Sequence, residues 1–107
     1  MGKSQRSKGY RRERQVVDAH REIGIACERV PLSGGAGYRG QSHDIDVSLG
    51  FTTLVCEVKS RGKGQGFRQL TTWLSDNDAI FLIADREPVL VTVPWRTWAL
   101  LLERLKR

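Results

Sequence analysis

Two acidic residues and one lysine have the types and the spacing of a metal-dependent phosphodiesterase site. Glu57 and Lys59 lie two residues apart in the strand-like segment LVCEVKS, so their side chains share one face of the strand. Asp44 precedes Glu57 by thirteen residues, which is enough for one strand, a tight turn and the return strand. The two carboxylates can then occupy neighbouring positions of an antiparallel pair. Two oxygen ligands this close suit Mg²⁺, which takes few protein carboxylates and keeps several waters.

A lysine beside the two acids adds the remaining group that phosphodiester hydrolysis needs. The ammonium group of Lys59 can position the attacking water or stabilise charge on a phosphate. A surface strand with cross-strand ion pairs is the alternative interpretation of the same residues. Asp46 also shares a face with Asp44, so an error in the expected pairing leaves Asp46 as the alternative metal ligand.

Helices and strands alternate around these residues. Apolar residues at helical spacing predict a first helix over residues 10–23, which Gly24 ends. The other expected elements are strands over 25–31, 43–50 and 51–60, a helix over 67–76, strands over 79–84 and 89–93, and a final helix over 94–107. Loops are expected at the two glycine-rich segments, 33–41 and 61–66. The order α-β-β-β-α-β-β-α predicts an α/β fold with a small mixed sheet flanked by helices.

The length and the charge of the chain suit one small basic domain. Its 107 residues predict a single core over residues 10–107, preceded by a flexible basic arm over residues 1–9. The net charge of +6 favours a polyanionic partner, and nucleic acid is the commonest of these. No apolar run approaches the roughly 20 residues that span a membrane. We therefore expect no membrane partner and a cytoplasmic location in a prokaryotic or phage-infected cell.

The two cysteines lack the sequence context of a metal or redox site. Cys27 and Cys56 have no CxxC spacing and no histidine at ligand spacing. Each lies in an apolar, strand-like segment. We expect reduced core thiols, with a disulfide or a metal role as the alternative.

The residues around the acid pair resemble a known nuclease motif. The dipeptide HD followed by EVK is similar to the motif of the PD-(D/E)xK nucleases. Asp44 takes the place of the aspartate in that motif, Glu57 that of the second acid, and Lys59 that of the lysine. His43 stands where the family often has proline.

The N-terminal half of the chain resembles a narrower family. Residues 11–34, RRERQVVDAHREIGIACERVPLSG, are similar to archaeal-type Holliday-junction resolvases, and the similarity covers roughly residues 9–60. The first helix of that family carries a Glu-Arg pair, which a glycine, an arginine at the end of a strand and a serine follow. In this sequence the corresponding residues are Glu13-Arg14, Gly24, Arg29 and Ser33.

The resemblance implies a restriction-endonuclease-like fold and a role for each matched residue. Glu13 would complete the Mg²⁺ site from the first helix, and Mn²⁺ is expected to substitute for Mg²⁺. Arg14 and Arg29 would hold phosphates, for which the arginine fork is suited. Ser33 would lie at the mouth of the site as a further catalytic residue. From the residues alone, Glu13 is a first-turn acid favoured by the helix dipole, and Arg14 is an exposed helical charge.

Further polar residues flank the proposed site on its C-terminal side. We expect these residues to contact the DNA backbone, with solvated surface positions as the alternative. They are Arg61, Lys63, Arg68 and Gln69.

Together these patterns predict a Mg²⁺-dependent DNA endonuclease, and most specifically a Holliday-junction resolvase that acts as a homodimer on four-way junctions. A symmetric junction needs two paired cuts, and a two-fold dimer supplies two equivalent sites. The final helix has more apolar residues than a core face needs, and the surplus could build the dimer. Two alternatives stay open: another small structure-specific or nonspecific nuclease of the same superfamily, and a basic DNA-binding module without catalysis.

Overall fold

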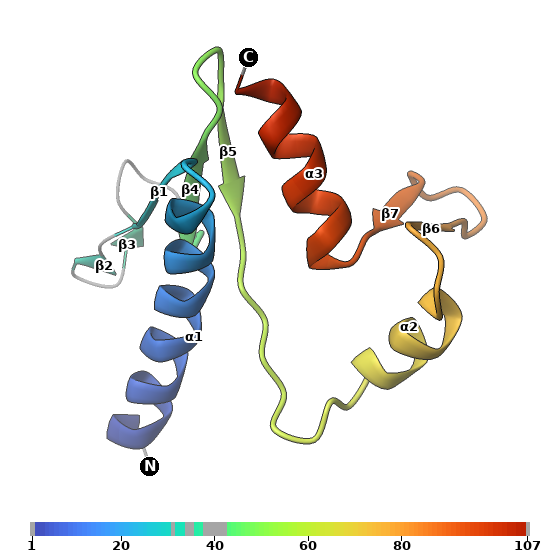
Figure 1. Cartoon of the computed structure of the whole chain (residues 1–107). Coiled ribbons are helices and arrows are strands. Elements are labelled where there is room, and N and C mark those ends of the chain that lie inside the picture. Colours follow the sequence, from blue (N-terminus) through green and yellow to red (C-terminus); the bar gives the residue numbers. More distant parts are fainter. Residues whose placement is uncertain (1, 31, 34–35, 38–42, 107) are drawn as a thin grey trace. The chain divides into compact units, whose positions relative to one another are not determined.

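The computed structural model describes residues 2–30, 32–33, 36–37 and 43–106, and the side chains of residues 9–30 and 43–106 (Figure 1). The chain divides into two compact units, which we call unit 1 (Met1–Ser60 with Leu105–Arg107) and unit 2 (Arg61–Arg104). The sequence predicts a single domain over residues 10–107. The division falls at the start of the glycine-rich segment 61–66, which has few side chains from which to build a shared core.

The first helix, α1 (Gly2–Glu22), supplies the helical layer of unit 1. Val17 and His20 are buried on its inner face, one turn apart. His20 is a core residue, since it is 2% exposed and its Nδ1 lies 2.8 Å from the carbonyl oxygen of Val16. Gly24 follows the helix with a φ of 78°, a left-handed conformation that glycine adopts without strain and that ends the helix here.

The first helix begins earlier than the sequence predicts, at Gly2 in place of residue 10. The helix already begins at Gly2, so residues 2–9 continue it. This stretch has no proline, and its lysine, arginine and glutamine residues are good helix formers. Adding such residues to a helix that is already nucleated is far easier than starting a new one. The basic residues expected on an arm therefore belong to α1.

Three antiparallel strands form the sheet of unit 1, in the order β1 (Ala26–Arg29), β4 (Ile45–Ser48) and β5 (Thr53–Cys56). α1 packs against β1 and β4 (Figure 1). Cys27 pairs with Val47, and Ile45 pairs with Cys56, so these side chains share one face of the sheet. That face carries the core of unit 1, whose buried apolar side chains are Val17, Ile25, Cys27, Val30, Ile45 and Val47.

A short hairpin lies in the segment that the sequence predicts to be a loop. β2 (Leu32–Ser33) and β3 (Ala36–Gly37) pair antiparallel. Strand pairing uses backbone N–H and C=O groups, so a glycine-rich segment can pair without the alternation of side chains on which a strand prediction depends. The rest of the predicted loop lies outside the described residues.

Unit 2 contains α2 (Phe67–Leu74), a hairpin of β6 (Ile80–Leu82) and β7 (Leu90–Thr92), and all but the last residue of α3 (Trp95–Leu105). The α/β class is confirmed. The described strands form three separate antiparallel sheets in place of one mixed sheet. Among the described residues, no helix has both the length and the apolar character needed to cross a bilayer.

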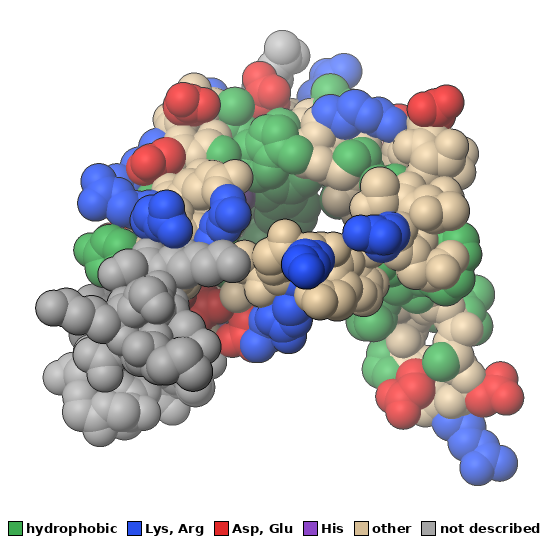
Figure 2. Space-filling view, turned by 90° about the horizontal axis from the view of Figure 1, so that it is seen from below, with side chains coloured by type: hydrophobic (Ala, Val, Ile, Leu, Met, Phe, Trp, Pro, Cys, Tyr) green, Lys and Arg blue, Asp and Glu red, His purple; other side chains and the backbone are tan. Residues whose placement is uncertain are grey.

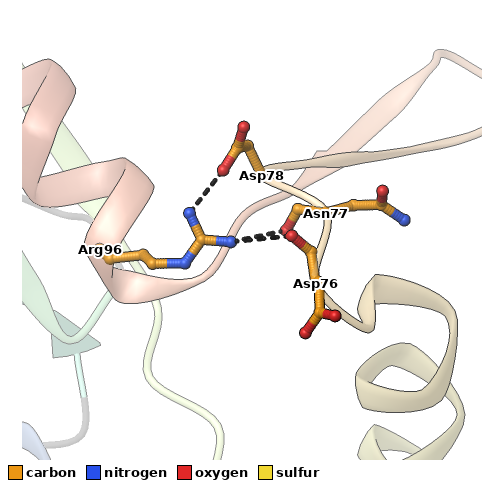
Figure 3. Close-up of polar contacts among 4 residues, drawn as sticks. All are labelled: Asp76, Asn77, Asp78 and Arg96. Atoms are coloured by element: carbon orange, nitrogen blue, oxygen red, sulfur yellow. Dashed lines mark hydrogen bonds and ion pairs between the residues drawn. The ribbon is translucent and has the colours of Figure 1, made fainter.

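A single arginine ties two segments of unit 2 together (Figure 3). Arg96, in the first turn of α3, donates from Nη1 to Oδ1 of Asp78. Its Nη2 donates to the backbone carbonyl oxygens of Asp76, at 3.3 Å, and Asn77, at 3.0 Å. These bonds connect the start of α3 to the turn between α2 and β6.

Replacing Arg96 with alanine is expected to lower the free energy of unfolding of unit 2 by about 1–2 kcal/mol, because two backbone carbonyls and one carboxylate lose their donor at a partly solvated site. All three tryptophans of the chain lie in unit 2, so urea unfolding followed by tryptophan fluorescence reports on this unit. Arg104→Ala, an exposed position of the same helix, is the matched control. Equal losses of stability in the two variants would contradict the stabilising role of the Arg96 hydrogen bonds.

Candidate active site

The predicted acid pair lies at one end of the sheet of unit 1. The register of β4 and β5 pairs Ile45 with Cys56. The N–H of Asp44 donates to the carbonyl oxygen of Cys56 at 3.0 Å, and the carbonyl oxygen of Asp44 accepts from the N–H of Val30 at 3.0 Å. The bond from Asp44 to Cys56 departs from this register, in which Ile45 is the partner of Cys56, so Asp44 and Ile45 both lie against Cys56 as in a β-bulge. Asp44 therefore lies beside the chain segment that carries Glu57.

The two candidate aspartates have different partners. Oδ2 of Asp44 accepts from the backbone N–H of Val58 at 2.7 Å. Oδ1 of Asp46 lies 2.6 Å from Nε2 of His43, and Asp46 is only 7% exposed. The buried carboxylate of Asp46 is therefore committed to an imidazole. Asp44 is better placed as a ligand because it bonds to Cys56 and Val58, the two neighbours of Glu57, and its hydrogen bond to Val58 uses only one carboxylate oxygen.

The pair formed by His43 and Asp46 was not expected from the sequence. When Nε2–H of His43 donates to the carboxylate of Asp46, the other ring nitrogen carries a lone pair. That nitrogen, Nδ1, is buried and has no hydrogen-bond partner among the described residues. The spacing of three residues is the only trace of the pair in the sequence, and the same residues were interpreted through the nuclease motif instead.

Glu57 and Lys59 lie beyond the end of β5 and remain accessible. Nζ of Lys59 lies 3.5 Å from Oε2 of Glu57, and their side chains are 63% and 52% exposed. An ion pair this exposed contributes little to stability. Both charged groups can therefore leave each other for a ligand or a phosphate at small cost. The predicted strand over 51–60 is shorter in the structure, since β5 ends at Cys56, so this contact does not depend on strand alternation.

Glu13 and Arg29 form a second charged pair on the α1 side of the sheet. Nε of Arg29 donates to Oε1 of Glu13 at 2.9 Å, and their side chains are 27% and 18% exposed. The guanidinium carbon of Arg29 lies 3.6 Å from the centre of the Tyr10 ring. Arg29 pairs with Ile45 of β4, the residue that follows Asp44 in the sequence. Arg29 therefore lies at the same end of the sheet as Asp44 and Glu57.

The donor chemistry at this end of the sheet partly matches the predicted Mg²⁺ site. Asp44 and Glu57 supply the carboxylate oxygens that Mg²⁺ prefers, and Mg²⁺ often uses only one or two carboxylates. Within the residues that the structure describes, no three His, Cys, Asp or Glu side chains come close enough together to hold a metal ion. Glu13, whose Oε1 accepts from Arg29, is therefore not joined to the pair as a third ligand. Its role in metal binding stays a prediction.

The remaining predicted residues are distributed over α1, β2 and unit 2. Arg14 is exposed on α1, and Ser33 lies in β2, outside the range of described side chains. The other four predicted residues belong to unit 2 and are Arg61, Lys63, Arg68 and Gln69. Among them, Nη2 of Arg68 donates to the carbonyl oxygen of Lys63 at 3.4 Å. Figure 2 shows Lys and Arg side chains exposed over the face seen from below. Contact with DNA stays a prediction for Arg14, Arg61, Lys63, Arg68 and Gln69.

Both cysteines are free, as expected from the sequence. Burial raises the pKa of the Cys27 thiol from its ordinary value of 9.0 to about 11, and the nearby Cys56 adds to the shift. Burial also raises the pKa of Cys56. Both groups are therefore neutral thiols near pH 7, which is the form that a core accepts.

The raised pKa of Cys27 predicts a loss of stability at high pH. In the unfolded chain the thiol ionises near 9.0, whereas in the folded chain it stays neutral to about 11. Its contribution is therefore fully present below pH 9 and is lost as the pH rises toward 11, with a slope of at most about 1.4 kcal/mol per pH unit. Urea unfolding at about pH 7.5, 9.5 and 10.5 measures this loss, because the first value lies below both pKa values and the other two lie between them. Cys27→Ala should show a weaker dependence, and an unchanged dependence in that variant would contradict the assignment.

Comparison with known proteins agrees with the fold and with the resemblance to the PD-(D/E)xK nucleases. The family model described as archaeal Holliday junction resolvase matches residues 4–96. The chain therefore belongs to the archaeal Holliday junction resolvase family. The match extends well beyond residue 60, where the resemblance recognised from the sequence ends. No curated protein and no solved structure matches the chain at a significant level.

Proposed function

We propose that this chain is a Mg²⁺-dependent endodeoxyribonuclease that resolves four-way DNA junctions by making paired nicks. The observation that carries the proposal is the placement of Asp44 beside Glu57 at the end of the sheet, where Asp44 bonds to Cys56 and Val58, the two neighbours of Glu57, and the ammonium of Lys59 lies beside Glu57. Family membership supports junction DNA as the substrate. The net charge of +6 supports a polyanionic substrate.

Each residue of the proposed site has a role that its chemistry supports. Asp44 and Glu57 would hold Mg²⁺ through carboxylate oxygens. The chemistry that Mg²⁺ would supply there is neutralisation of charge on the scissile phosphate and activation of a water molecule. Lys59 leaves its exposed pair with Glu57 and donates to the phosphate oxygens, where negative charge increases as the attacking oxygen adds to phosphorus.

The other charged residues bind and orient the substrate. Arg29 offers the N–H groups of its terminal nitrogens to a phosphate, because Glu13 engages only its Nε. The remaining cations bind the DNA backbone without reading sequence, so affinity should fall steeply with salt. Mn²⁺ should replace Mg²⁺ because it accepts the same oxygen ligands.

We also propose that the active form is a homodimer and that the hairpin of unit 2 provides its interface. Phe81, Ile83 and Leu90 are 67%, 79% and 62% exposed. Together with Trp73 they line an open groove of about 720 Å³ in unit 2. A two-stranded hairpin is marginally stable by itself and needs further packing. An apolar surface of this kind marks an interaction site.

A second copy of the chain is the occupant that fits this groove best. A four-way junction presents two equivalent strands for cutting, and a two-fold dimer buries the same patch on both subunits while supplying two acid pairs. The free edges of β6 and β7 also allow strand pairing between copies. The partner of the groove is thus another copy of the same groove and hairpin.

Cleavage of a labelled four-way junction, with a linear duplex of the same sequence as competitor, tests the proposed function. The proposal predicts cutting in Mg²⁺ or Mn²⁺, no cutting in EDTA, and strong preference for the junction. Equal cutting of both substrates would keep the acid pair as a nuclease site but contradict junction specificity. Salt-dependent binding without cutting in any divalent cation would contradict the enzyme and leave a DNA-binding module.

A further inference from the structure

Arg29 is held from one side by two residues of α1. Tyr10 and Glu13 are three residues apart, so they lie on the same helix face, one turn from each other. The ring of Tyr10 lies 3.6 Å from the guanidinium carbon, and Oε1 of Glu13 accepts from Nε at 2.9 Å. The two contacts use different parts of the guanidinium: the ring covers its flat face, and the carboxylate takes one edge.

These contacts constrain the group without using its phosphate-binding edge. Stacking engages no N–H donor, and the Glu13 bond uses Nε–H alone. The four N–H groups of the two terminal nitrogens stay in the plane that the ring fixes, which is the geometry that a phosphate accepts from an arginine fork. Without the ring, one hydrogen bond leaves the plane free to turn about its axis. An arginine oriented in advance loses less entropy when it binds.

The exposure of Tyr10 argues against a role in the core. Tyr10 is 48% exposed, whereas Val17, two turns further along the same helix, is 3% exposed. Tyr10 therefore lies at the edge of the core and not inside it. Its contact with Arg29 is the specific interaction that it makes, and Arg29 lies one residue from Asp44 across the ladder.

We propose that Tyr10 is a positioning residue for cleavage, which fixes the plane of the Arg29 guanidinium so that it meets the scissile phosphate in register with the acid pair. This inference rests on the proposed nuclease function, because it assigns Arg29 to a phosphate. The aromatic face carries the effect and the hydroxyl does not. Phenylalanine should therefore replace Tyr10, and leucine should not.

Single-turnover cleavage of a four-way junction at saturating enzyme tests the proposal. Tyr10→Leu is expected to cut about five- to tenfold more slowly than the natural protein, the range of an arginine–aromatic contact at a partly buried site. Tyr10→Phe should cut at the natural rate. In an Arg29→Ala background, Tyr10→Leu should cause no further loss, because the group that it positions is gone. Thermal unfolding of each variant shows whether the fold is kept.

The possible outcomes separate this inference from the proposed function. If the natural protein cuts and Tyr10→Leu cuts at the same rate, the positioning role is wrong while the nuclease stands. A Tyr10→Leu loss that persists in the Arg29→Ala background would also overturn the positioning role, because the ring would then act through the fold. Failure of the natural protein to cut any junction would instead overturn the proposed function.

Discussion

Asp44→Asn is expected to lower the rate of junction cleavage in Mg²⁺ by on the order of a thousandfold, the size of effect seen when a charge-stabilising group is removed from an active site. Asparagine has nearly the same shape and keeps a carbonyl oxygen that can accept from the N–H of Val58. The substitution therefore removes the ligand charge beside Glu57 but leaves the sheet intact. Gel separation of end-labelled junction strands measures the rate.

Asp46→Asn is the matched control, because it makes the same chemical change two residues further along β4. The asparagine oxygen can still accept from Nε2 of His43. Asp46→Asn should lower the cleavage rate by at most about tenfold to a hundredfold, as expected for residues that hydrogen-bond near a metal ligand without contacting the metal. A larger loss in Asp46→Asn than in Asp44→Asn would reverse the assignment of the ligand. Equal and small losses in both would remove the metal site from this end of the sheet.

Phe81→Glu is expected to weaken self-association by about 30-fold or more, because it places a charge at the centre of the proposed interface. Phe81 is 67% exposed within one chain, so the substitution should leave unit 2 folded. Sedimentation velocity over a concentration series measures the dissociation constant. At concentrations where the variant is monomeric, paired nicking of the junction should give way to single nicks.

Phe51→Glu provides the control for the dimer prediction. Phe51 is 75% exposed in the turn between β4 and β5 of unit 1, so the same charge is added at a similarly exposed phenylalanine outside the groove. This variant should associate like the natural protein. A natural protein that sediments as a monomer at all concentrations, or a Phe81→Glu variant as tightly associated as the control, would contradict the proposed interface.

The closeness of Asp44 to Glu57 could be predicted from the sequence because a hairpin joins β4 to β5 and so brings the residues at their ends together. This prediction required no knowledge of how α1 lies on the sheet. Alternation along a strand was less informative, because β5 ends at Cys56, before Glu57 and Lys59. The choice between Asp44 and Asp46 required the register, which sequence patterns define only to within a residue or two.

The contacts between distant elements could not be predicted in the same way. Arg29 meets Tyr10 and Glu13 because α1 packs on β1 at a particular angle, and no spacing along the chain encodes that angle. The bond between Arg96 and Asp78 depends likewise on the path of unit 2. The helical start at Gly2 was missed because polar composition was interpreted as disorder, whereas the same lysines and arginines are good helix formers.

The most direct test of the central claim uses a supercoiled plasmid that carries an inverted repeat and extrudes a cruciform, which is a four-way junction. If one dimer hydrolyses two opposed strands with one acid pair in each subunit, the plasmid should become linear in Mg²⁺, stay intact in EDTA, and stay intact with Glu57→Gln. Accumulation of nicked circles without linear product would contradict paired cutting. Intact plasmid with the natural protein in Mg²⁺ and in Mn²⁺ would contradict the nuclease itself.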